Sequence, residues 1–306
     1  MSKRRGLTPP KGDIDMVKRY SRPANLAEAI KLKASDPGSL YLAGGTFLLA
    51  GDKREKPEAL IDIGSILPSG VERRGDELVI GAGTSFQALA DDSAAPAVLR
   101  KAALQMANRN VRNRATVGGN LGAGKTCASL VSPLLALDAK VSVAVAASFT
   151  AAGDVEALNE GLIPLSDWLA APEGLIVNIH IKLPLGRRAA SRRWGRTACD
   201  LSVITAAVAF TASRQAAGSH TAEASDAEAL ILDVHVVLGG LGPHARRFPE
   251  IEKLLECKPL PTKTQIETMV EPLLMSIDDQ RGSAAFKRLR AAGLVADALH
   301  GTEALS

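Results

Sequence analysis

The sequence predicts an α+β protein of two domains, and three observations lead to this fold class. In the first half of the chain, short apolar runs with the alternation of strands are interspersed with helical patterns. The second half holds two longer strand patterns followed by three helical ones, as expected for a small antiparallel sheet with helices on one side. A polar, basic stretch at 184–190 separates the halves, and 306 residues are enough for two domains of ordinary size.

The first half begins with a predicted helix at 26–34, which follows the good N-cap residue Asn25 and ends at the breakers of 36–38. A short strand at 39–42 leads into a glycine turn at 43–46, after which a helix could begin at 47–50. Alternation of apolar residues predicts four further strands, at 60–63, 77–80, 139–146 and 175–183. Helical patterns follow at 86–89, 95–106, 131–137 (with Pro133 in its first turn) and 163–169.

The second half is simpler. Strands are predicted at 201–211 and 229–238, and helices at 251–255, 263–274 and 283–298. With the boundary in the basic break, we expect domains at 14–186 and 190–300. Residues 1–13 carry Lys3, Arg4 and Arg5 before two prolines, and we interpret them as a disordered, solvated tail.

The amino-acid composition excludes several classes of function. The 37 Lys and Arg residues are nearly balanced by 33 Asp and Glu residues, and a net charge of +4 is too small for a nucleic-acid binder. The three cysteines, Cys127, Cys199 and Cys257, form no C-x-x-C pair, so we expect no zinc site or iron–sulfur cluster within this chain. So few cysteines suit a reducing compartment, and no apolar run has the length of a membrane span. We therefore predict a cytoplasmic protein.

Two glycine motifs overlap in the segment 112–139. Gly119, Gly124, Lys125 and Thr126 match the G-x-x-x-x-G-K-T phosphate loop of nucleoside triphosphatases. That loop needs a buried strand before it and a long helix after it. The preceding residues 108–115 contain three arginines, and Pro133 interrupts the segment that follows. A nucleotide hydrolase is therefore the least favoured function, and we interpret the match as a coincidence in a glycine-rich loop.

The second motif is R-A-T-V-G-G-N at 114–120. Like it, the segment A-G-G-T at 43–46 combines two adjacent glycines with a short polar residue. Glycines at a strand end let the backbone approach an anion closely, and exposed amide N–H groups then act as donors. Gly44 with Gly45, and Gly118 with Gly119, are expected to serve a pyrophosphate in this way, helped by the short polar side chains of 116 and 120. Each motif alone is equally compatible with a tight turn. Two of them about seventy residues apart in one domain favour a dinucleotide site.

Several segments together carry a family resemblance. LAGGT (42–46), IDI (61–63), IGAGTSFQAL (80–89), RNRATVGGNL (112–121) and PLLALDAKV (133–141) follow one another in the order found in the flavin subunits of xanthine and carbon monoxide dehydrogenases. The second half continues it with GRTACDLSVITAAVAF (195–210), GGLGPHARR (239–247) and RGSAAFKRLRAAGLVADAL (281–299). Over 14–299, the chain resembles the FAD-binding medium subunit of the molybdenum hydroxylase family.

The resemblance implies a fold and a cofactor site. The fold is a two-lobed FAD-binding PCMH-type domain at 14–186, followed by a carbon monoxide dehydrogenase flavoprotein-like C-terminal domain at 190–300, with FAD between the two lobes. The main cofactor-binding residues implied are Leu42, Ala43, Gly44, Gly45, Thr46, Phe47, Thr116, Val117, Gly118, Gly119 and Asn120. Met106, Gly122, Ile176 and the pair Arg192 and Arg193 are further candidates. Met106 is equally compatible with a core position, and the arginine pair with a solvated linker.

One departure from the family pattern concerns this site. Many relatives carry an Asp thirteen residues after the position of Thr116, where this chain has Ser129. A serine still offers a hydrogen bond to a ribose hydroxyl, but the carboxylate is gone. Nearby, Lys125 adds a positive charge where relatives usually have a small neutral residue. Either FAD affinity is weaker in this chain, or the pyrophosphate gains a lysine as a partner.

The implied function is electron transfer. In the family, electrons pass from a molybdopterin-containing large subunit through a 2Fe–2S small subunit to FAD, and then to an acceptor such as NAD or a quinone, within a heterotrimer. We therefore predict an FAD-dependent oxidoreductase subunit with no catalytic acid or base of its own, and we interpret His180 and His235 as structural. The arginines of 185–196 are either a solvated loop or a surface for an acidic partner. The alternative is a subunit that has lost the flavin and acts as a scaffold.

Overall fold

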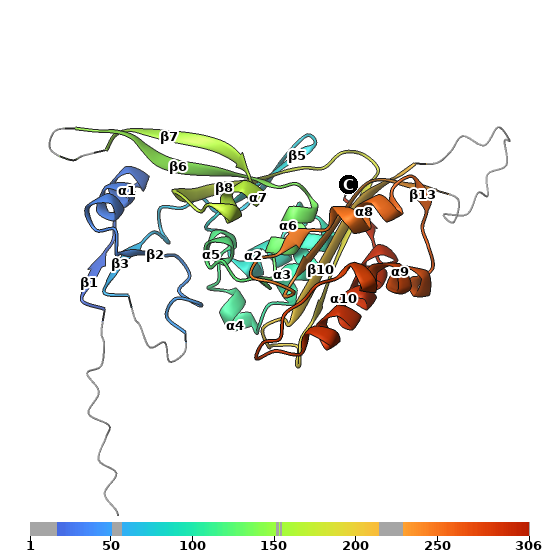
Figure 1. Cartoon of the computed structure of the whole chain (residues 1–306). Coiled ribbons are helices and arrows are strands. Elements are labelled where there is room, and N and C mark those ends of the chain that lie inside the picture. The colour runs from blue at the N-terminus through green and yellow to red at the C-terminus, as the bar shows by residue number, and fades with distance from the viewer. Residues whose placement is uncertain (1–16, 51–56, 151–152, 154, 214–228, 306) are drawn as a thin grey trace, which may run out of the picture.

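The computed structural model describes residues 17–50, 57–150, 153, 155–213 and 229–305, and the predicted tail at 1–13 lies outside them (Figure 1). The described chain forms three sheets, which follow one another along the sequence. A small N-terminal lobe and a larger lobe make up the first half, and the second half forms the third sheet with its helices. Helices and strands are mixed throughout, which confirms the predicted α+β class.

The N-terminal lobe is a three-stranded parallel sheet with one helix. Its elements are β1 (Arg19–Ser21), α1 (Leu26–Ser35), β2 (Leu40–Leu42) and β3 (Ala59–Asp62), with the strand order β1-β3-β2. As predicted, the Asn25 side chain caps α1 by accepting a hydrogen bond from the Glu28 amide. The segment after β2 is a turn and not the helix predicted at 47–50. Within it, the Leu49 amide donates to the Gly45 carbonyl at 2.9 Å.

The larger lobe is a five-stranded antiparallel sheet in the order β4-β5-β8-β6-β7. Its strands are β4 (Val71–Arg74), β5 (Glu77–Gly81), β6 (Lys140–Phe149), β7 (Val155–Pro164) and β8 (Leu175–Lys182). Its helices are α2 (Phe86–Asp91), α3 (Ala97–Leu104), α4 (Arg109–Arg112), α5 (Val117–Gly122), α6 (Val131–Ala136) and α7 (Leu165–Ala170). The sequence did not predict β7, because this edge strand is mostly exposed and lacks an apolar alternation.

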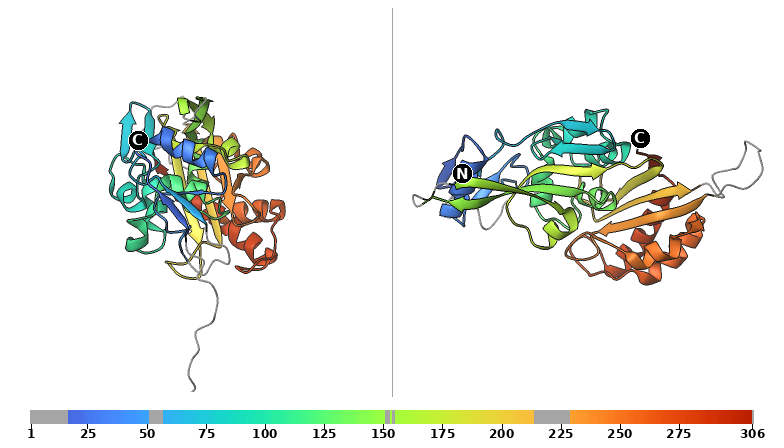
Figure 2. Two further views of the ribbon diagram at one scale, coloured as in Figure 1. Left: turned by 90° about the vertical axis from the view of Figure 1, so that its left-hand side faces the viewer. Right: turned by 90° about the horizontal axis from the view of Figure 1, so that it is seen from above.

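The second half forms an antiparallel sheet in the order β12-β11-β10-β9-β14, with helices on one face (Figure 2, right). The strands are β9 (Arg187–Trp194), β10 (Ile204–Ser213), β11 (Leu230–Gly239), β12 (Arg246–Arg247), β13 (Lys258–Pro259), which pairs with β11, and β14 (Glu303–Ala304). The helices are α8 (Pro249–Leu255), α9 (Lys263–Val270), the 3₁₀ turn η2 (Glu271–Leu273) and α10 (Ala284–Leu299). The two long strands and three helices are those that the sequence predicted.

The basic stretch around residue 187, predicted as a polar break, is instead a strand of this sheet. Its role as a surface for an acidic partner stays a prediction. The Arg187 side chain is 5% exposed and donates to the carbonyl and the carboxylate of Asp233, both at 2.5 Å. Its other guanidinium nitrogen lies 2.9 Å from Nδ1 of His235, which makes that histidine a structural residue, as predicted. Arginines can occupy this strand because Arg187, Arg188 and Arg193 donate to acceptors elsewhere in the molecule.

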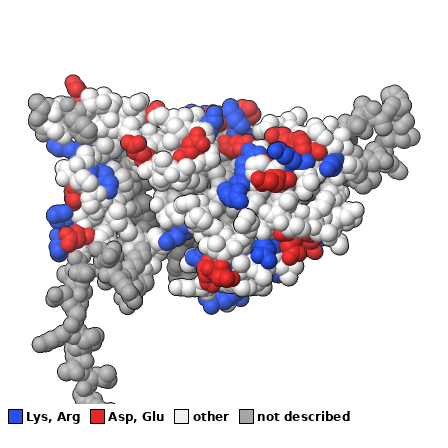
Figure 3. All heavy atoms as spheres, in the orientation of Figure 1, with Lys and Arg blue, Asp and Glu red and all other residues white. Residues whose placement is uncertain are grey.

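The two faces of the third sheet are covered differently. Val208, Val236 and Leu238 pack with the helices α8 to α10, whereas Ala207, Ala209 and Val237 belong to the core of the first half. Helix α6 lies on this second face, where the Ser132 and Thr205 hydroxyls are hydrogen-bonded at 2.8 Å. On the face in Figure 3, basic and acidic side chains are interspersed, as the balanced composition predicts.

Candidate functional site

The two glycine segments predicted to bind a cofactor are in backbone contact. A Cβ atom on Gly44 would lie 1.8 Å from the Arg114 carbonyl oxygen and 3.1 Å from Cα of Ala115. Gly44 follows β2 in the N-terminal lobe, and Arg114 lies two residues before Thr116 in the larger lobe. The missing side chain of Gly44 therefore allows the lobes to meet at the two segments that the sequence singled out.

The turn after β2 presents unpaired amides. In the described part of the chain, the amide N–H groups of Gly44, Gly45 and Thr46 have no hydrogen-bond acceptor. Gly45 adopts a φ of +72°, in the left-handed region that favours glycine. Successive N–H groups in such a turn can form a concave anion-binding site, so this turn has donors of the kind that a diphosphate would need.

The second segment is different, and the prediction of free amide donors at its glycines is wrong. It forms the short helix α5, whose first amides are already paired. Gly118 donates to the Ala82 carbonyl at 2.8 Å, and Gly119 donates to the Thr116 hydroxyl at 3.1 Å. A Cβ atom on Gly118 would lie 2.8 Å from Cβ of Ala82, so this glycine allows helix and strand to pack closely.

Helix α5 leaves open space beside its backbone and holds one amide side chain in place. A Cβ on Gly122 would meet no atom within 4 Å, and one on Gly119 would meet only the Thr116 hydroxyl, at 2.8 Å. The Asn120 carbonyl oxygen accepts a hydrogen bond from the Leu130 amide at 3.2 Å. The Asn120 NH₂ group has no partner among the described residues, so it is a positioned donor for a ligand.

Lys125 connects the two segments. It follows α5, and its ammonium nitrogen lies 4.4 Å from the centre of the Phe47 ring, in the turn after β2. Such a position over a ring face is a cation–π contact. Phe47 is 41% exposed, so the pair lies at the surface end of the candidate site.

The residues of the phosphate-loop motif do not form a phosphate loop. Gly119 lies inside α5, and the helix after Lys125 begins only at Val131. The Thr126 hydroxyl, which would hold magnesium in such a loop, donates to the Gly242 carbonyl at 2.7 Å and accepts from the Gly240 amide at 3.1 Å. These bonds tie the loop after α5 to the second half of the chain, and they leave no geometry for triphosphate binding.

The remaining candidates lie in different environments. Leu42 and Val117 are buried core residues, and Ala43 is partly buried beside them. Ile176 is buried in β8, next to Val177, whose carbonyl accepts a hydrogen bond from Ala82. Met106 follows α3 and packs partly buried against the core, and Ser129 is half-buried with no side-chain hydrogen bond in the described structure.

The structure separates Arg192 from Arg193. Adjacent residues of a strand point to opposite faces of its sheet. Arg192 lies against Gly301, where an added Cβ would be 1.8 Å from its guanidinium, at the end of α10. Arg193 donates to the Gln105 carbonyl at 2.8 Å, next to Met106, and to the Ser202 hydroxyl at 2.9 Å. The structure thus brings Arg193 to the first half of the chain and does not bring Arg192 there.

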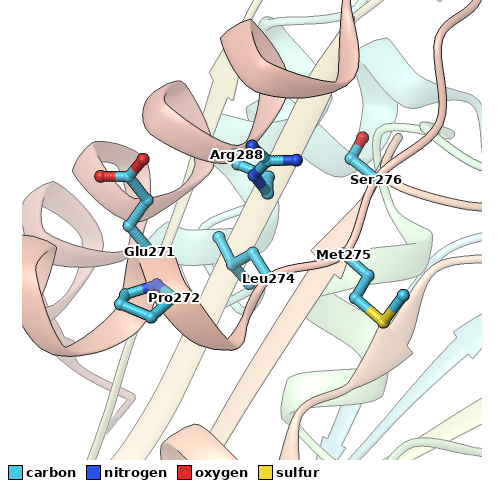
Figure 4. Close-up of a pocket in the computed structure, with 6 residues that line it drawn as sticks. All are labelled: Glu271, Pro272, Leu274, Met275, Ser276 and Arg288. Carbon is cyan, nitrogen blue, oxygen red and sulfur yellow. The ribbon is translucent and has the colours of Figure 1, made fainter.

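A surface hollow of about 550 Å³ lies elsewhere in the molecule. It is lined by residues of η2, of the segment after it and of α10, namely Glu271, Pro272, Leu274, Met275, Ser276 and Arg288 (Figure 4). None of the predicted cofactor residues lines it. Within the described ranges, no three His, Cys, Asp or Glu side chains are grouped as metal ligands, and no helix has the length and apolarity to cross a membrane.

Comparisons with known proteins agree on one family. The family described as "FAD binding domain in molybdopterin dehydrogenase" matches residues 15–181. The uncharacterized protein YgfM of Escherichia coli K12 is 31% identical over 285 residues, which are 92% of this chain and 95% of that protein. The nicotine 6-hydroxylase medium subunit of Paenarthrobacter nicotinovorans is 26% identical over 298 residues, covering 93% and 95% of the two chains.

A solved structure is similar in fold. A chain of the carbon monoxide dehydrogenase from Hydrogenophaga pseudoflava superposes with a TM-score of 0.77 at 24% sequence identity. The match covers 94% of this chain and 96% of that one. The similarity therefore extends over both halves of the molecule and supports the same arrangement of lobes and C-terminal sheet.

Proposed function

Since the chain belongs to the family of FAD-binding domains of molybdopterin dehydrogenases, we propose that it works as the electron-transfer subunit of a molybdenum hydroxylase complex. It is an FAD-dependent oxidoreductase subunit, and FAD is its cofactor. The observation that carries the proposal is the contact between Gly44 and Arg114, which joins the unpaired amides of one lobe to the open helix α5 of the other.

The residues at this contact fit a flavin dinucleotide. The amides of Gly44, Gly45 and Thr46 would hold the diphosphate, and the free NH₂ group of Asn120 would bind it or the ribityl chain. The open space at Gly122 would admit the ligand close to the backbone. Of the other candidates, we retain Leu42, Ala43, Phe47, Met106, Thr116, Val117, Gly118, Lys125, Ser129 and Ile176 as neighbours of the site. The bound flavin supplies the redox chemistry, and the protein supplies binding, orientation and electrostatics.

Arg193, rather than Arg192, is the arginine that we propose near the flavin. Its guanidinium binds Gln105 of the first half, and its bonds to the Ala198 and Asp200 carbonyls hold the loop after β9. Arg193 would thus order the segment where the two halves meet. We propose domains at 14–186 and 190–300. The family match, which ends at 181, supports the first of them, whereas β9 begins the third sheet already at Arg187.

The proposed partners are a molybdopterin-containing large subunit and a 2Fe–2S small subunit, in a heterotrimer. The name of the Paenarthrobacter relative, a medium subunit, supports a multi-subunit assembly. Electrons would travel from the molybdenum centre through the clusters to FAD and on to an acceptor such as NAD or a quinone. We propose the cytoplasm as its location, since exposed free thiols such as Cys199 and Cys257 persist in a reducing compartment.

Two measurements test this function. The purified chain should show the visible absorption bands of oxidised flavin after incubation with FAD, whereas a flavin-free scaffold subunit would stay colourless. Affinity purification of the tagged chain from its native host should recover two partner chains together with molybdenum and iron. If the chain is recovered alone and metal-free, and reduces an acceptor with its own small-molecule donor, it is a separate flavoenzyme and the proposal fails.

A further inference from the structure

The loop that carries Lys125 is held on both sides by its neighbours. Before it, the Asn120 side chain binds the Leu130 amide and so closes the loop on itself. After it, the Thr126 hydroxyl is clamped between Gly240 and Gly242 of the second half. The position of Lys125 next to the turn after β2 is therefore built into the fold, although Lys125 itself is exposed and its long side chain can rotate.

The ammonium of Lys125 lies over the Phe47 ring and has no carboxylate partner among the described residues. The ring below it belongs to Phe47, which directly follows Thr46, the last of the three residues with an unpaired amide. Among the described residues, no Asp or Glu oxygen lies within 4.0 Å of the ammonium. An exposed cation–π contact is weaker than a charge-assisted hydrogen bond to a phosphate oxygen. A diphosphate bound to the amides would therefore attract the ammonium away from the ring.

We propose that Lys125 is the diphosphate-binding cation of this site, and that its contact with Phe47 is the resting position of that cation when no dinucleotide is bound. This inference rests on the proposed function and deepens it, because it assigns the charge that balances the flavin dinucleotide. The amide N–H groups would orient the phosphate oxygens through hydrogen bonds, and the ammonium would neutralise part of the negative charge of the diphosphate. Flavin binding should therefore depend on Lys125 through electrostatics, and salt should weaken it.

A salt-dependent titration tests this role. We would measure the dissociation constant of FAD from the quenching of flavin fluorescence, with the wild-type chain and the variants Lys125→Met and Lys125→Arg, at low and at high NaCl concentration. Lys140→Met is the matched control: it removes an exposed lysine from β6 and changes the net charge equally. We expect Lys125→Met to weaken binding about tenfold at low salt and to flatten the salt dependence, whereas Lys125→Arg and Lys140→Met stay near wild type.

The possible results distinguish a failure of the Lys125 inference from a failure of the proposed flavin-binding function. Equal affinity and equal salt dependence for Lys125→Met and wild type would overturn the inference and leave the flavin proposal intact. A loss of affinity that is the same at every salt concentration would also overturn it, because the lysine would then act by packing rather than by charge. If the wild-type chain itself does not bind FAD at any salt concentration, the proposed function fails, and the inference fails with it.

Discussion

The contact between Gly44 and Arg114 can be tested by adding one methyl group. In Gly44→Ala, the new Cβ would lie 1.8 Å from the Arg114 carbonyl oxygen and 2.7 Å from its carbonyl carbon. A carbon and an oxygen need about 3.3 Å, so the turn must move away by about 1.5 Å. The clashing atoms belong to the backbone of the other lobe and cannot rotate aside. The substitution therefore separates the two halves of the proposed cofactor site.

The size of the effect follows from that displacement. Forcing an extra methyl into a packed contact costs about 1–3 kcal/mol, and we expect the upper end because the obstacle is backbone. A shift of about 1.5 Å would also move the amides of the turn out of reach of a diphosphate held by the other lobe, since a hydrogen bond requires donor and acceptor within about 3.2 Å. Each lost bond to a charged phosphate is worth about 1.5–3 kcal/mol. FAD affinity should therefore fall at least about tenfold.

The assay is a fluorescence titration with FAD, together with a thermal unfolding curve by circular dichroism to establish that the variant is folded at the titration temperature. Gly161→Ala is the control, because its Cβ in the edge strand β7 would meet no atom within 4 Å. The control should match wild type in both measurements. If folded Gly44→Ala bound FAD as tightly as wild type, the cofactor would not lie across this contact, and the proposed site would be wrong.

Three further substitutions have defined outcomes. Ser129→Asp restores the carboxylate of the family pattern and should tighten FAD by up to about 1.5–3 kcal/mol in calorimetry; unchanged affinity would mean that this position does not reach the ligand. Thr126→Val leaves the polar backbone groups of Gly240 and Gly242 unpaired and should lower stability by about 1–3 kcal/mol in urea unfolding, and Thr126→Ser should restore it. Burial raises the pKa of Asp279, but hydrogen bonds from Lys287 and the Arg281 amide outweigh it, so this pKa lies below its usual value. The ionised Asp279 therefore stabilises the folded protein at pH values above its pKa in the unfolded chain. This stabilisation is lost as the pH falls through the pKa of Asp279 in the folded protein. Asp279→Asn removes the carboxylate partner of the fully buried Lys287 ammonium and should cost about 3 kcal/mol near pH 7. The difference from wild type should be smaller below about pH 4, and a difference independent of pH would contradict this.

The sequence by itself determined the order and type of most long elements and the family. The helix from Leu26, the strands around Ile179 and Val208, and the closing helix from Ala284 each carry an apolar periodicity that their own residues reveal. The motifs at 42–46 and 114–120 were recognisable because the glycines and short polar residues stand close together in the chain. Local sequence therefore located the two segments of the proposed site.

Only the tertiary structure determined which groups of those two segments meet and which remain available to a ligand. Gly44 meets Arg114 across seventy residues of chain, so no local pattern could reveal that contact. Whether the Gly118 amide is free depends on the Ala82 carbonyl, and whether Arg192 or Arg193 faces the first half depends on the register of β9 beside β10. A shift of one residue in that register would exchange the two arginines. The sequence specifies which groups are present, whereas burial, register and remote hydrogen-bond partners specify which of them remain available to a ligand.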